Sequence, residues 1–528
     1  MSSSSPTSTL RLYASLAVYA AAVFLPGALA VLSQVPPSAK TTRKWRLNVM
    51  ILSSVMTEMP QIFLLLKLFI IIFASGAGIF DAYPAGHSGS WCFCLGSIAH
   101  ALYYLDVAVC LGIWALFLQS YFARFIVEEN TKQYRALDSN DPPGFFHLGF
   151  WFRLLNPFWS ARGVLVHPDI CYATNEELKA SDNPAAELYL SLDVHMHPSY
   201  PRNRPVLIYI HGGSWSTGDK TITPPFVSYM ALKRWVVVSV NYRLYPHSKY
   251  PTHLIDVKRA IRWVRQHIAR YGGDPSFIAI SGNAAGGHLA SMAALTPNDP
   301  LYQPGFEDVD TTVQACVLTN AVVDLTNHKR FWRYRFQEWF SQYIAGFGKN
   351  GYAAHEEFLK ASSPVLLLKQ IEALRRKSAG VTAQVTESHE PAHGEGLKEA
   401  RIKAEAPVVA AAEVAGEEEA GKKPRAMTGA EELPPFLIFH GRADHLVPFR
   451  SVRDFVQSFK KVSKSPICYI EFPCANHMFD ILSSPRSHYM AYGIDRFLGR
   501  MYERHGTKPA LQVPLRRKPT LRALNEGR

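Results

Sequence analysis

Cysteine is scarce in this sequence, and its positions form no pattern that would organise a small domain. The 528 residues contain seven cysteines, and this odd number with this spacing fits no disulfide framework. No group of cysteine and histidine residues has the spacing of a zinc site. Cys92 and Cys94 lie in an apolar run, where we expect them to act as small apolar residues. The lack of a disulfide framework is typical of proteins in a reducing compartment. The sequence also gives no indication of a metal or an organic cofactor.

Basic residues alternating with aromatic residues are also missing, although the formal net charge is +13. A groove that binds nucleic acid by charge and stacking needs such stretches, so we exclude nucleic acid as a partner. Part of the excess charge belongs to the proline-containing tail 504–528. A tail of this kind is usually disordered and solvated, and the alternative is contact with anionic lipid.

Long apolar runs are confined to residues 1–127, which we interpret as a membrane region with about three transmembrane helices. The run from Leu12 to Leu32 contains no charged residue and is long enough to cross a bilayer. The run 49–80 contains Glu58 and Lys67, so Lys67 must lie inside an apolar segment or extend to its edge. For this second run, a re-entrant or interfacial hairpin is the alternative to a span.

The third run, 91–122, contains only Asp106 as a charged residue before its end. The first run has a rival interpretation, because Ala28-Leu29-Ala30 resembles a signal-peptidase site. Cleavage there would leave the basic loop 33–48 on the outer side, against the positive-inside tendency. We therefore expect an integral membrane protein with its N-terminus outside and everything after Arg124 in the cytosol.

Strands alternate with helices in the remainder of the chain. Residues 128–162 look like a connector, whose aromatic stretch 145–159 either lies along the membrane surface or packs on the following domain. Buried or alternating patterns predict strands over 188–194, 206–210, 235–240, 277–280, 436–439 and 467–472. Apolar residues at helical spacing predict helices over 254–271, from about 286, and over 451–462 and 487–502. The alternation predicts an α/β domain over 163–503 with a mostly parallel central sheet.

Two segments interrupt this pattern. Residues 369–433 are rich in alanine, glutamate, lysine and glycine with little periodicity, so we expect a disordered insertion between core elements. Residues 324–350 are rich in aromatic residues and are expected to form a cap over a site.

Polar motifs follow several predicted strands, in the order that acyl transfer by a serine hydrolase needs. That chemistry uses a nucleophile on a sharp strand–turn–helix, a histidine base, an acid that orients it, and backbone N–H groups facing the oxyanion. His211-Gly212-Gly213-Ser214-Trp215 follows 206–210 and supplies the oxyanion loop. Asp444 follows 436–439, and His477 follows 467–472. The predicted oxyanion donors are the N–H groups of Gly212, Gly213 and Ala285.

The expected nucleophile position is an alanine. The turn after 277–280 reads Gly282-Asn283-Ala284-Ala285-Gly286-Gly287-His288, where the elbow motif of this fold reads G-x-S-x-G. Gly282 and Gly286 are the glycines that the strained turn demands, but Ala284 has no nucleophilic atom. Ser281 and Ser214 are close in sequence, and neither has the expected geometry to replace it.

Each piece also has a simpler interpretation when taken alone. His-Gly-Gly is often an ordinary turn, Asp444 could cap a turn, and His477 could be a core histidine. His288 and His445 are assigned to a helix face and a loop, and Asp480 is a weaker acid candidate because it follows the histidine. The joint order and strand-end placement favour the catalytic interpretation.

From about Gly163 to Leu498, apart from the insertion, the chain resembles the hormone-sensitive-lipase-like esterases and lipases of the α/β-hydrolase fold. It is especially similar to membrane-associated bacterial and eukaryotic esterases. The matching motifs are HGG-x-W, NYRL-x-P, GGDP, G-x-S-AGGHLA and HG-x-x-D-x-L-VP, at residues 211–215, 241–246, 272–275, 282–290 and 440–448. The resemblance implies that Asp444 orients His477, that His477 is general base and acid, and that the ligand is an apolar carboxylic ester or acyl compound.

Ala284 departs from the family pattern and predicts little or no turnover as written. Three origins account for it: a silent hydrolase that binds a ligand or partner in its pocket, a serine-to-alanine change in a working esterase, or a sequence error. The intact Asp444, His477 and oxyanion loop favour the second and third, because long disuse would erode them. A pocket kept for binding would also keep its shape, so the first stays open.

Overall fold

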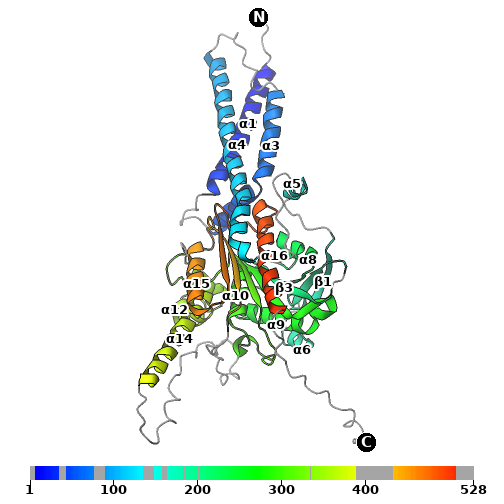
Figure 1. Ribbon diagram of the computed structural model, residues 1–528. Helices are drawn as coiled ribbons and strands as arrows, with labels where there is room; N and C mark the ends of the chain where they lie inside the picture. The colour runs from blue at the N-terminus through cyan, green and yellow to red at the C-terminus, as the bar shows by residue number, and fades with distance from the viewer. Residues whose placement is uncertain are drawn as a thin grey trace, which may run out of the picture.

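A bundle of long helices stands on an α/β domain in the computed structural model (Figure 1). The structure describes residues 6–34, 43–76, 90–134, 148–156, 163–181, 186–199, 202–332, 335–387 and 432–506. The expected basic tail from 507 onward lies outside these residues, as does 388–431 of the expected insertion.

The α/β domain is built on an eight-stranded sheet in the order β1-β2-β4-β3-β5-β6-β7-β8. β1 and β2 pair antiparallel to each other, β2 pairs antiparallel to β4, and the other neighbours are parallel. The strands are β1 (Leu165–Cys171), β2 (Ser191–Met196), β3 (Arg204–Ile210), β4 (Val236–Val240), β5 (Gly273–Asn283), β6 (Ala315–Thr319), β7 (Phe436–Gly441) and β8 (Ile467–Phe472). The carboxyl ends of the parallel strands meet at one edge, which gathers the predicted motifs.

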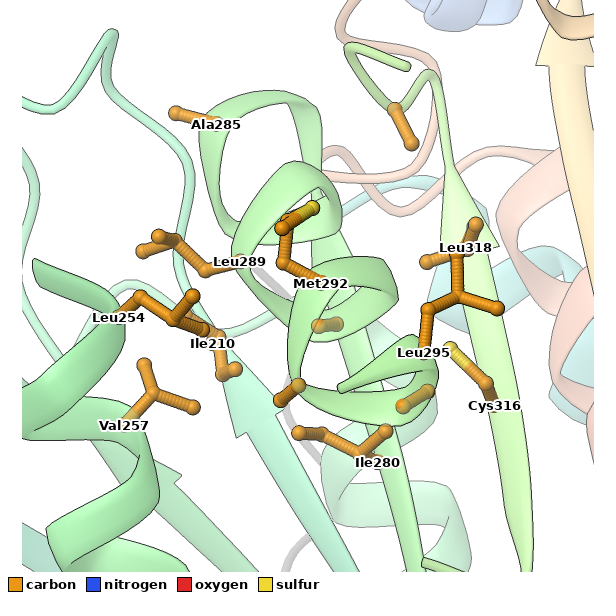
Figure 2. Packing of buried hydrophobic residues seen from close by; sticks show 14 of the residues in the cluster. Ile210, Leu254, Val257, Ile280, Ala285, Leu289, Met292, Leu295, Cys316 and Leu318 are labelled. Atoms are coloured by element: carbon orange, nitrogen blue, oxygen red, sulfur yellow. The ribbon is translucent and has the colours of Figure 1, made fainter. Parts of the chain in front are cut away.

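Alternate residues of each strand face two separate cores. Ile208 and Ile210 of β3 belong to one apolar cluster, and Leu207 and Tyr209 to the other. The first core lies under α9 and α10, whose side chains meet those of β3, β5 and β6 (Figure 2). This face also carries α13, α14 and α15, whereas α8 and α16 cover the other face. Both faces of the sheet are therefore buried, as a parallel sheet requires.

The remaining helices are short or lie outside the sheet layers. All helices of the structure are α1 (Pro6–Leu32), α2 (Arg43–Glu58), α3 (Pro60–Gly76), α4 (Ser90–Thr131), α5 (Leu148–Leu154), α6 (Asn175–Lys179), α7 (Ala186–Tyr189), α8 (Pro225–Leu232), α9 (Thr252–His267), α10 (Ala284–Leu295), α11 (Phe336–Trp339), α12 (Gly351–Ala354), α13 (Glu356–Ala361), α14 (Pro364–Glu387), α15 (Phe449–Val462) and α16 (Pro485–Gly506).

The bundle consists of α1, α3 and α4, with α2 at its base (Figure 1). Two segments, Ala14–Leu32 and Ile98–Tyr134, are long and apolar enough to cross a membrane, or three if the bent pair Ile51–Glu58 and Pro60–Gly76 is one span. That pair bends by 80°, so the predicted second run is two helices rather than one.

Lys67 lies inside the bundle rather than at its edge. Its ammonium group forms an ion pair with Asp106 of α4, and it also donates to the Ala22 carbonyl at 2.8 Å. Tyr19 donates from its hydroxyl to the other Asp106 oxygen at 3.0 Å. Lys67 of the second apolar run and Asp106 of the third therefore neutralise each other within the bundle.

α4 extends from the bundle onto the α/β domain. Of the expected connector 128–162, residues 135–147 and 157–162 lie outside the described residues. The boundary expected at residue 127 falls inside this helix, and Phe117 and Val127 belong to the same apolar core as α8 and α16. The Asn130 carbonyl lies 3.5 Å from the Cys468 sulfur at the start of β8. The apolar run continues into the packed face of the sheet because α4 keeps burying side chains there.

Two other expectations need correction. Residues 369–387 are helical and not a disordered insertion, because Val365, Leu368 and Ile371 recur at helical spacing and pack into the core. The strand expected over 188–194 begins only at Ser191, because residues 186–189 form a helical turn.

Candidate active site

The turn between β5 and α10 has the strained shape of a nucleophile elbow. Ala284, the first residue of α10, has a φ of +50°, a left-handed conformation that costs a non-glycine residue about 1–2 kcal/mol. A Cβ on Gly282 would lie 2.3 Å from the Gly286 carbonyl oxygen, and one on Gly286 would lie 2.2 Å from that of Ile210. Both glycines are needed because backbone fills the space that a side chain would take.

The loop after β3 lies directly against this elbow. A Cβ on Gly212 would be 3.4 Å from the Cβ of Ala284. Gly213 has a φ of +121°, and a Cβ there would collide with the Thr217 carbonyl oxygen at 2.0 Å. Ala285 follows Ala284 in the first turn of α10, where backbone N–H groups have no partner within their helix. Of the expected donors Gly212, Gly213 and Ala285, Gly212 and Ala285 thus border residue 284.

His211 is part of the wall of this loop. Its ring stacks on Tyr242 with centroids 4.5 Å apart, and its Nδ1 lies 2.7 Å from the Gly212 carbonyl oxygen. Burial lowers the pKa of His211, which keeps the ring neutral near pH 7. The side chain therefore shapes the loop and does not add a charge to it.

Asp444 and His477 meet although they follow different strands. Nδ1 of His477 lies 2.7 Å from Oδ2 of Asp444, and both side chains are buried. Oδ1 of Asp444 accepts hydrogen bonds from the N–H groups of Leu446 and Val447, each at 2.8 Å. The aspartate is thereby fixed on one oxygen and holds the imidazole with the other.

The electrostatics of this pair favour charge on both partners. Burial would lower the pKa of His477, but the adjacent Asp444 carboxylate outweighs it and raises that pKa. Burial would raise the pKa of Asp444, but the nearby His477 and the hydrogen bonds that it receives lower it. Asp444 thus stays ionised and stabilises a protonated His477.

Asp480 has a different partner. Both of its carboxylate oxygens accept from Nδ2 of Asn283, at 2.8 and 2.7 Å. Burial raises the pKa of Asp480 to about 6, although these hydrogen bonds oppose the shift. Asp480 therefore braces the elbow residue that precedes Ala284, and Asp444 holds the histidine.

The other nearby candidates lie in supporting positions. Nε2 of His288 lies 2.8 Å from the Ser362 carbonyl oxygen, and this ring is buried against Trp215. Ser281 is inside the sheet, paired with Tyr209 and Val317, and so does not reach the strand end. His445 is half-buried in the loop beside Asp444.

The aromatic segment expected to form a cap packs on the oxyanion loop. The Trp215 ring lies 4.9 Å from Phe340 and 6.5 Å from Phe336, which stacks on Trp332 at 4.0 Å. Tyr334, another member of the segment, lies outside the described residues. These rings make the surroundings of Trp215 apolar.

Asn320 is a site residue that sequence reasoning missed. It follows β6 with a φ of +47°, accepts from the Gly441 N–H at 2.9 Å, and donates to the His477 carbonyl oxygen at 2.5 Å. It links the ends of β7 and β8, and so the two partners of the dyad. The available signal was an asparagine directly after a short apolar run, which favours a left-handed strand end.

The arrangement can hold and polarise an ester carbonyl and can move a proton at His477, but residue 284 offers no atom for covalent attack. Within the described ranges, no group of three or more His, Cys, Asp or Glu side chains could hold a metal ion.

Comparison with known proteins identifies relatives of the α/β domain. A model of the family described as BD-FAE matches residues 192–373. The chain is 36% identical over 314 residues to the probable carboxylic ester hydrolase LipM of Mycobacterium tuberculosis, covering 59% of this chain and 58% of that protein. It is 32% identical over 317 residues to esterase LipQ of the same organism, covering 59% and 60% respectively. The chain thus spans less than two thirds of the length of these two relatives.

Similar solved structures include a truncated carbohydrate esterase from gut microbiota, with 19% identity and a TM-score of 0.44 over 65% of this chain and 99% of that one. Esterase B from Lactobacillus Rhamnosis has 15% identity and a TM-score of 0.44, over 68% and 92%. The α/β domain is therefore homologous to mycobacterial carboxylic ester hydrolases and has the α/β-hydrolase fold.

Proposed function

We propose that this chain is a membrane-anchored member of the family that binds apolar carboxylic esters or acyl ligands at the sheet edge and turns them over little or not at all. The observation that carries the proposal is Ala284. Its backbone has the left-handed turn of a nucleophile elbow, beside a formed Asp444–His477 pair, while its side chain is only a methyl group. The supporting parts of a hydrolase are present without the atom that attacks.

A serine at position 284 would complete the reaction sequence. Its Oγ would attack the ester carbonyl carbon while His477 accepts the hydroxyl proton, and the N–H groups of Gly212, Gly213 and Ala285 would bind the oxyanion. When the tetrahedral intermediate collapses, the bond to the alcohol oxygen breaks and His477 returns the proton to that oxygen. Water, deprotonated by His477, then attacks the carbonyl carbon of the acyl-enzyme. The bond from that carbon to the serine oxygen breaks and His477 returns the proton to this oxygen, which releases the acid and the free serine.

Without the serine, only binding and the oxyanion donors remain. Removing the nucleophile of a Ser-His-Asp triad costs about 10⁶-fold in turnover, and roughly 10³-fold acceleration over water persists from those remaining parts. We therefore assign ligand binding to the chain as written. Esterase activity is the chemistry that its relatives' names describe.

We further propose that the bundle of α1, α3 and α4 is embedded in a membrane and that the α/β domain lies in the cytosol. Apolar side chains of α3 and α4 are exposed on the outside of the bundle, among them Leu68, Phe69, Ile72 and Trp114. A helix bundle in water would not keep such a surface uncovered. The basic loop 33–48 supports the cytosolic placement by the positive-inside tendency.

The decisive experiment compares the purified chain as written with Ala284→Ser on p-nitrophenyl esters of short and long acyl chains. We expect hydrolysis by the serine variant at least about 10⁴-fold above the chain as written. Ala284→Ser combined with His477→Ala is the control, because it supplies the hydroxyl without its base. Activity in the chain as written would contradict the proposal and would show a different nucleophile.

A purely non-catalytic binding protein is the second candidate, supported by the same intact pocket residues. It predicts that Ala284→Ser stays inactive while acyl ligands still raise the melting temperature of both proteins. An inactive serine variant with no ligand-induced shift would contradict both candidates.

A further inference from the structure

The loop that carries His477 contacts the base of the helix bundle as well as the sheet. The loop leaves β8 after Phe472 and reaches α16 at Pro485. On its inner side, Asn320 donates to the His477 carbonyl oxygen, and the Ala443 N–H donates to the Ala475 carbonyl oxygen at 3.0 Å. Its outer side lies against Ser33 and the bend between α2 and α3.

Asn476, the residue before His477, contacts this base directly. Its Nδ2 lies 3.4 Å from the Ser33 carbonyl oxygen and 3.4 Å from the Thr57 hydroxyl. The Asn476 and Thr57 side chains are 1% and 0% exposed, so both contacts are shielded from solvent. The placement of residue 476 therefore depends on residues more than 400 positions earlier.

Arg486, at the start of α16, also contacts both the base of the helix bundle and the loop that carries His477. It forms a buried ion pair with Glu58 at 2.6 Å and donates to the Thr57 carbonyl oxygen at 3.2 Å. Its other terminal nitrogen donates to the Pro473 carbonyl oxygen at 3.4 Å, at the start of the loop. One guanidinium thus joins the bend of the bundle to the segment that leads to the histidine.

A helix bundle that only anchored the α/β domain in a membrane would not need a buried ion pair between Glu58 and Arg486. Burying a charge pair costs several kcal/mol per ion, which good geometry and further hydrogen bonds must offset. Where buried ion pairs persist, fixing one arrangement of the parts is a role that some of them serve. Here the arrangement that Glu58 and Arg486 fix is the position of the His477 loop relative to the bundle.

We propose that Thr57 and Glu58 are positioning residues for His477, so that the bundle completes the active site and does not merely anchor it. They act through Asn476 and Arg486, whose contacts hold the His477 loop between the edge of the sheet and the base of the bundle. The functional part of this proposal rests on the esterase chemistry proposed above, whereas its structural part does not.

The functional test uses the full chain carrying Ala284→Ser, in detergent or lipid nanodiscs, with a p-nitrophenyl ester. Glu58→Gln keeps the shape of the side chain and removes its charge. We expect kcat to fall by about 10²-fold, the effect of a small misplacement of a catalytic group, with KM little changed. Thr57→Val should lower kcat in the same way, and the conservative Thr57→Ser should restore it.

The matched control is Asp106→Asn, which breaks another buried ion pair of the same bundle that contacts no part of the loop. It should lower the melting temperature without the selective loss of kcat. Equal losses of kcat in Glu58→Gln and Asp106→Asn would overturn the proposal, because they would reflect general destabilisation.

A second measurement needs no activity. Hydrogen exchange of the full chain as written, followed by mass spectrometry, reports the protection of amides 473–484. We expect Glu58→Gln to speed exchange there at least about tenfold and Asp106→Asn to leave it unchanged. Unchanged exchange in Glu58→Gln would overturn the proposal. If Ala284→Ser proves inactive, the proposed chemistry fails, and the exchange result alone decides whether the bundle positions the loop.

Discussion

Two buried ion pairs, one in the helix bundle and one in the α/β domain, have similar contacts but different surroundings. In the bundle, Lys67 pairs with Asp106, and the other Asp106 oxygen accepts from Tyr19. In the α/β domain, Asp444 pairs with His477, and its other oxygen accepts two backbone N–H groups. The first pair connects three helices, whereas the second stands at strand ends beside a strained turn.

The comparison shows that burial and charge alone do not mark a reaction site. Perturbed ionisable groups occur in structural ion-pair networks as well as in active sites. What distinguishes the proposed catalytic pair, Asp444 and His477, is its neighbourhood: a strained turn at Ala284 and a glycine loop at Gly212 that lie against each other. The bundle pair has no such neighbourhood and serves to satisfy charges among apolar helices.

The largest expected effect comes from Asp444→Asn in the Ala284→Ser protein. The amide cannot hold His477 in the tautomer that accepts the serine proton, so kcat should fall by about 10⁴-fold. Steady-state hydrolysis of a p-nitrophenyl ester measures it, with Asp106→Asn as the comparison. Retained activity in Asp444→Asn would mean that another acid, with Asp480 as the first candidate, orients the histidine.

The next largest effect is a loss of stability when the Lys67–Asp106 ion pair of the bundle is broken. Asp106→Asn leaves the Lys67 ammonium buried without a charged partner and should destabilise the protein by about 3–5 kcal/mol. Replacing both residues, as Lys67→Met with Asp106→Leu, should restore most of that loss because no charge remains. Unfolding in mixed micelles with increasing SDS compares the three proteins. If the double variant is as unstable as the single one, the pair has a role beyond mutual neutralisation.

Much of the α/β domain could be predicted because its signals are local. β3, β4, β7 and β8 are short apolar runs, and the motif residues follow them directly. β6 was missed, since Ala315–Thr319 is a five-residue run that periodicity cannot assign by itself. β1 was missed because it is a half-exposed edge strand without regular alternation. Asn320 was lost along with β6.

The junction between bundle and loop could not be predicted for a different reason. Glu58 and Arg486 are 428 positions apart, and neither stands in a motif. In the sequence, Glu58 reads only as an interruption of an apolar run and Arg486 as one of many basic residues. Their pairing follows from α4 continuing without a break from the bundle onto the sheet, which only the assembled fold contains.

The protonation of His477 should set the pH dependence of the Ala284→Ser protein. Its kcat/KM should rise with pH as His477 loses its proton, and the raised pKa of His477 places the midpoint above the ordinary 6.5. Asp480→Asn removes a negative charge that contributes to this shift, so the midpoint should move to lower pH. A midpoint below 6.5 in the parent, or no movement in Asp480→Asn, would contradict these assignments.

The smallest expected effect comes from substituting an exposed apolar residue of α5, a helix that packs on the α/β domain and also contacts the base of the bundle. Phe150 is buried in the core of the domain, while Leu148 and Phe152 are 74% and 73% exposed. Gln61 of α3 donates to the Leu154 carbonyl oxygen at 2.9 Å, so the exposed face lies at the base of the bundle (Figure 1). We expect this face to enter the lipid interface.

Phe152→Ser should change the stability in detergent by no more than about 0.5 kcal/mol, because the side chain is already exposed there. In liposomes, an apolar carbene probe confined to the bilayer should label Leu148 and Phe152, with the modified residues identified by mass spectrometry. Leu188, which is 61% exposed on α7 of the α/β domain, is the matched control and should stay unlabelled. Equal labelling of α5 and Leu188 would show that exposure to solvent, and not depth in the membrane, determines the reaction, and the exposed face of α5 would then lie outside the lipid interface.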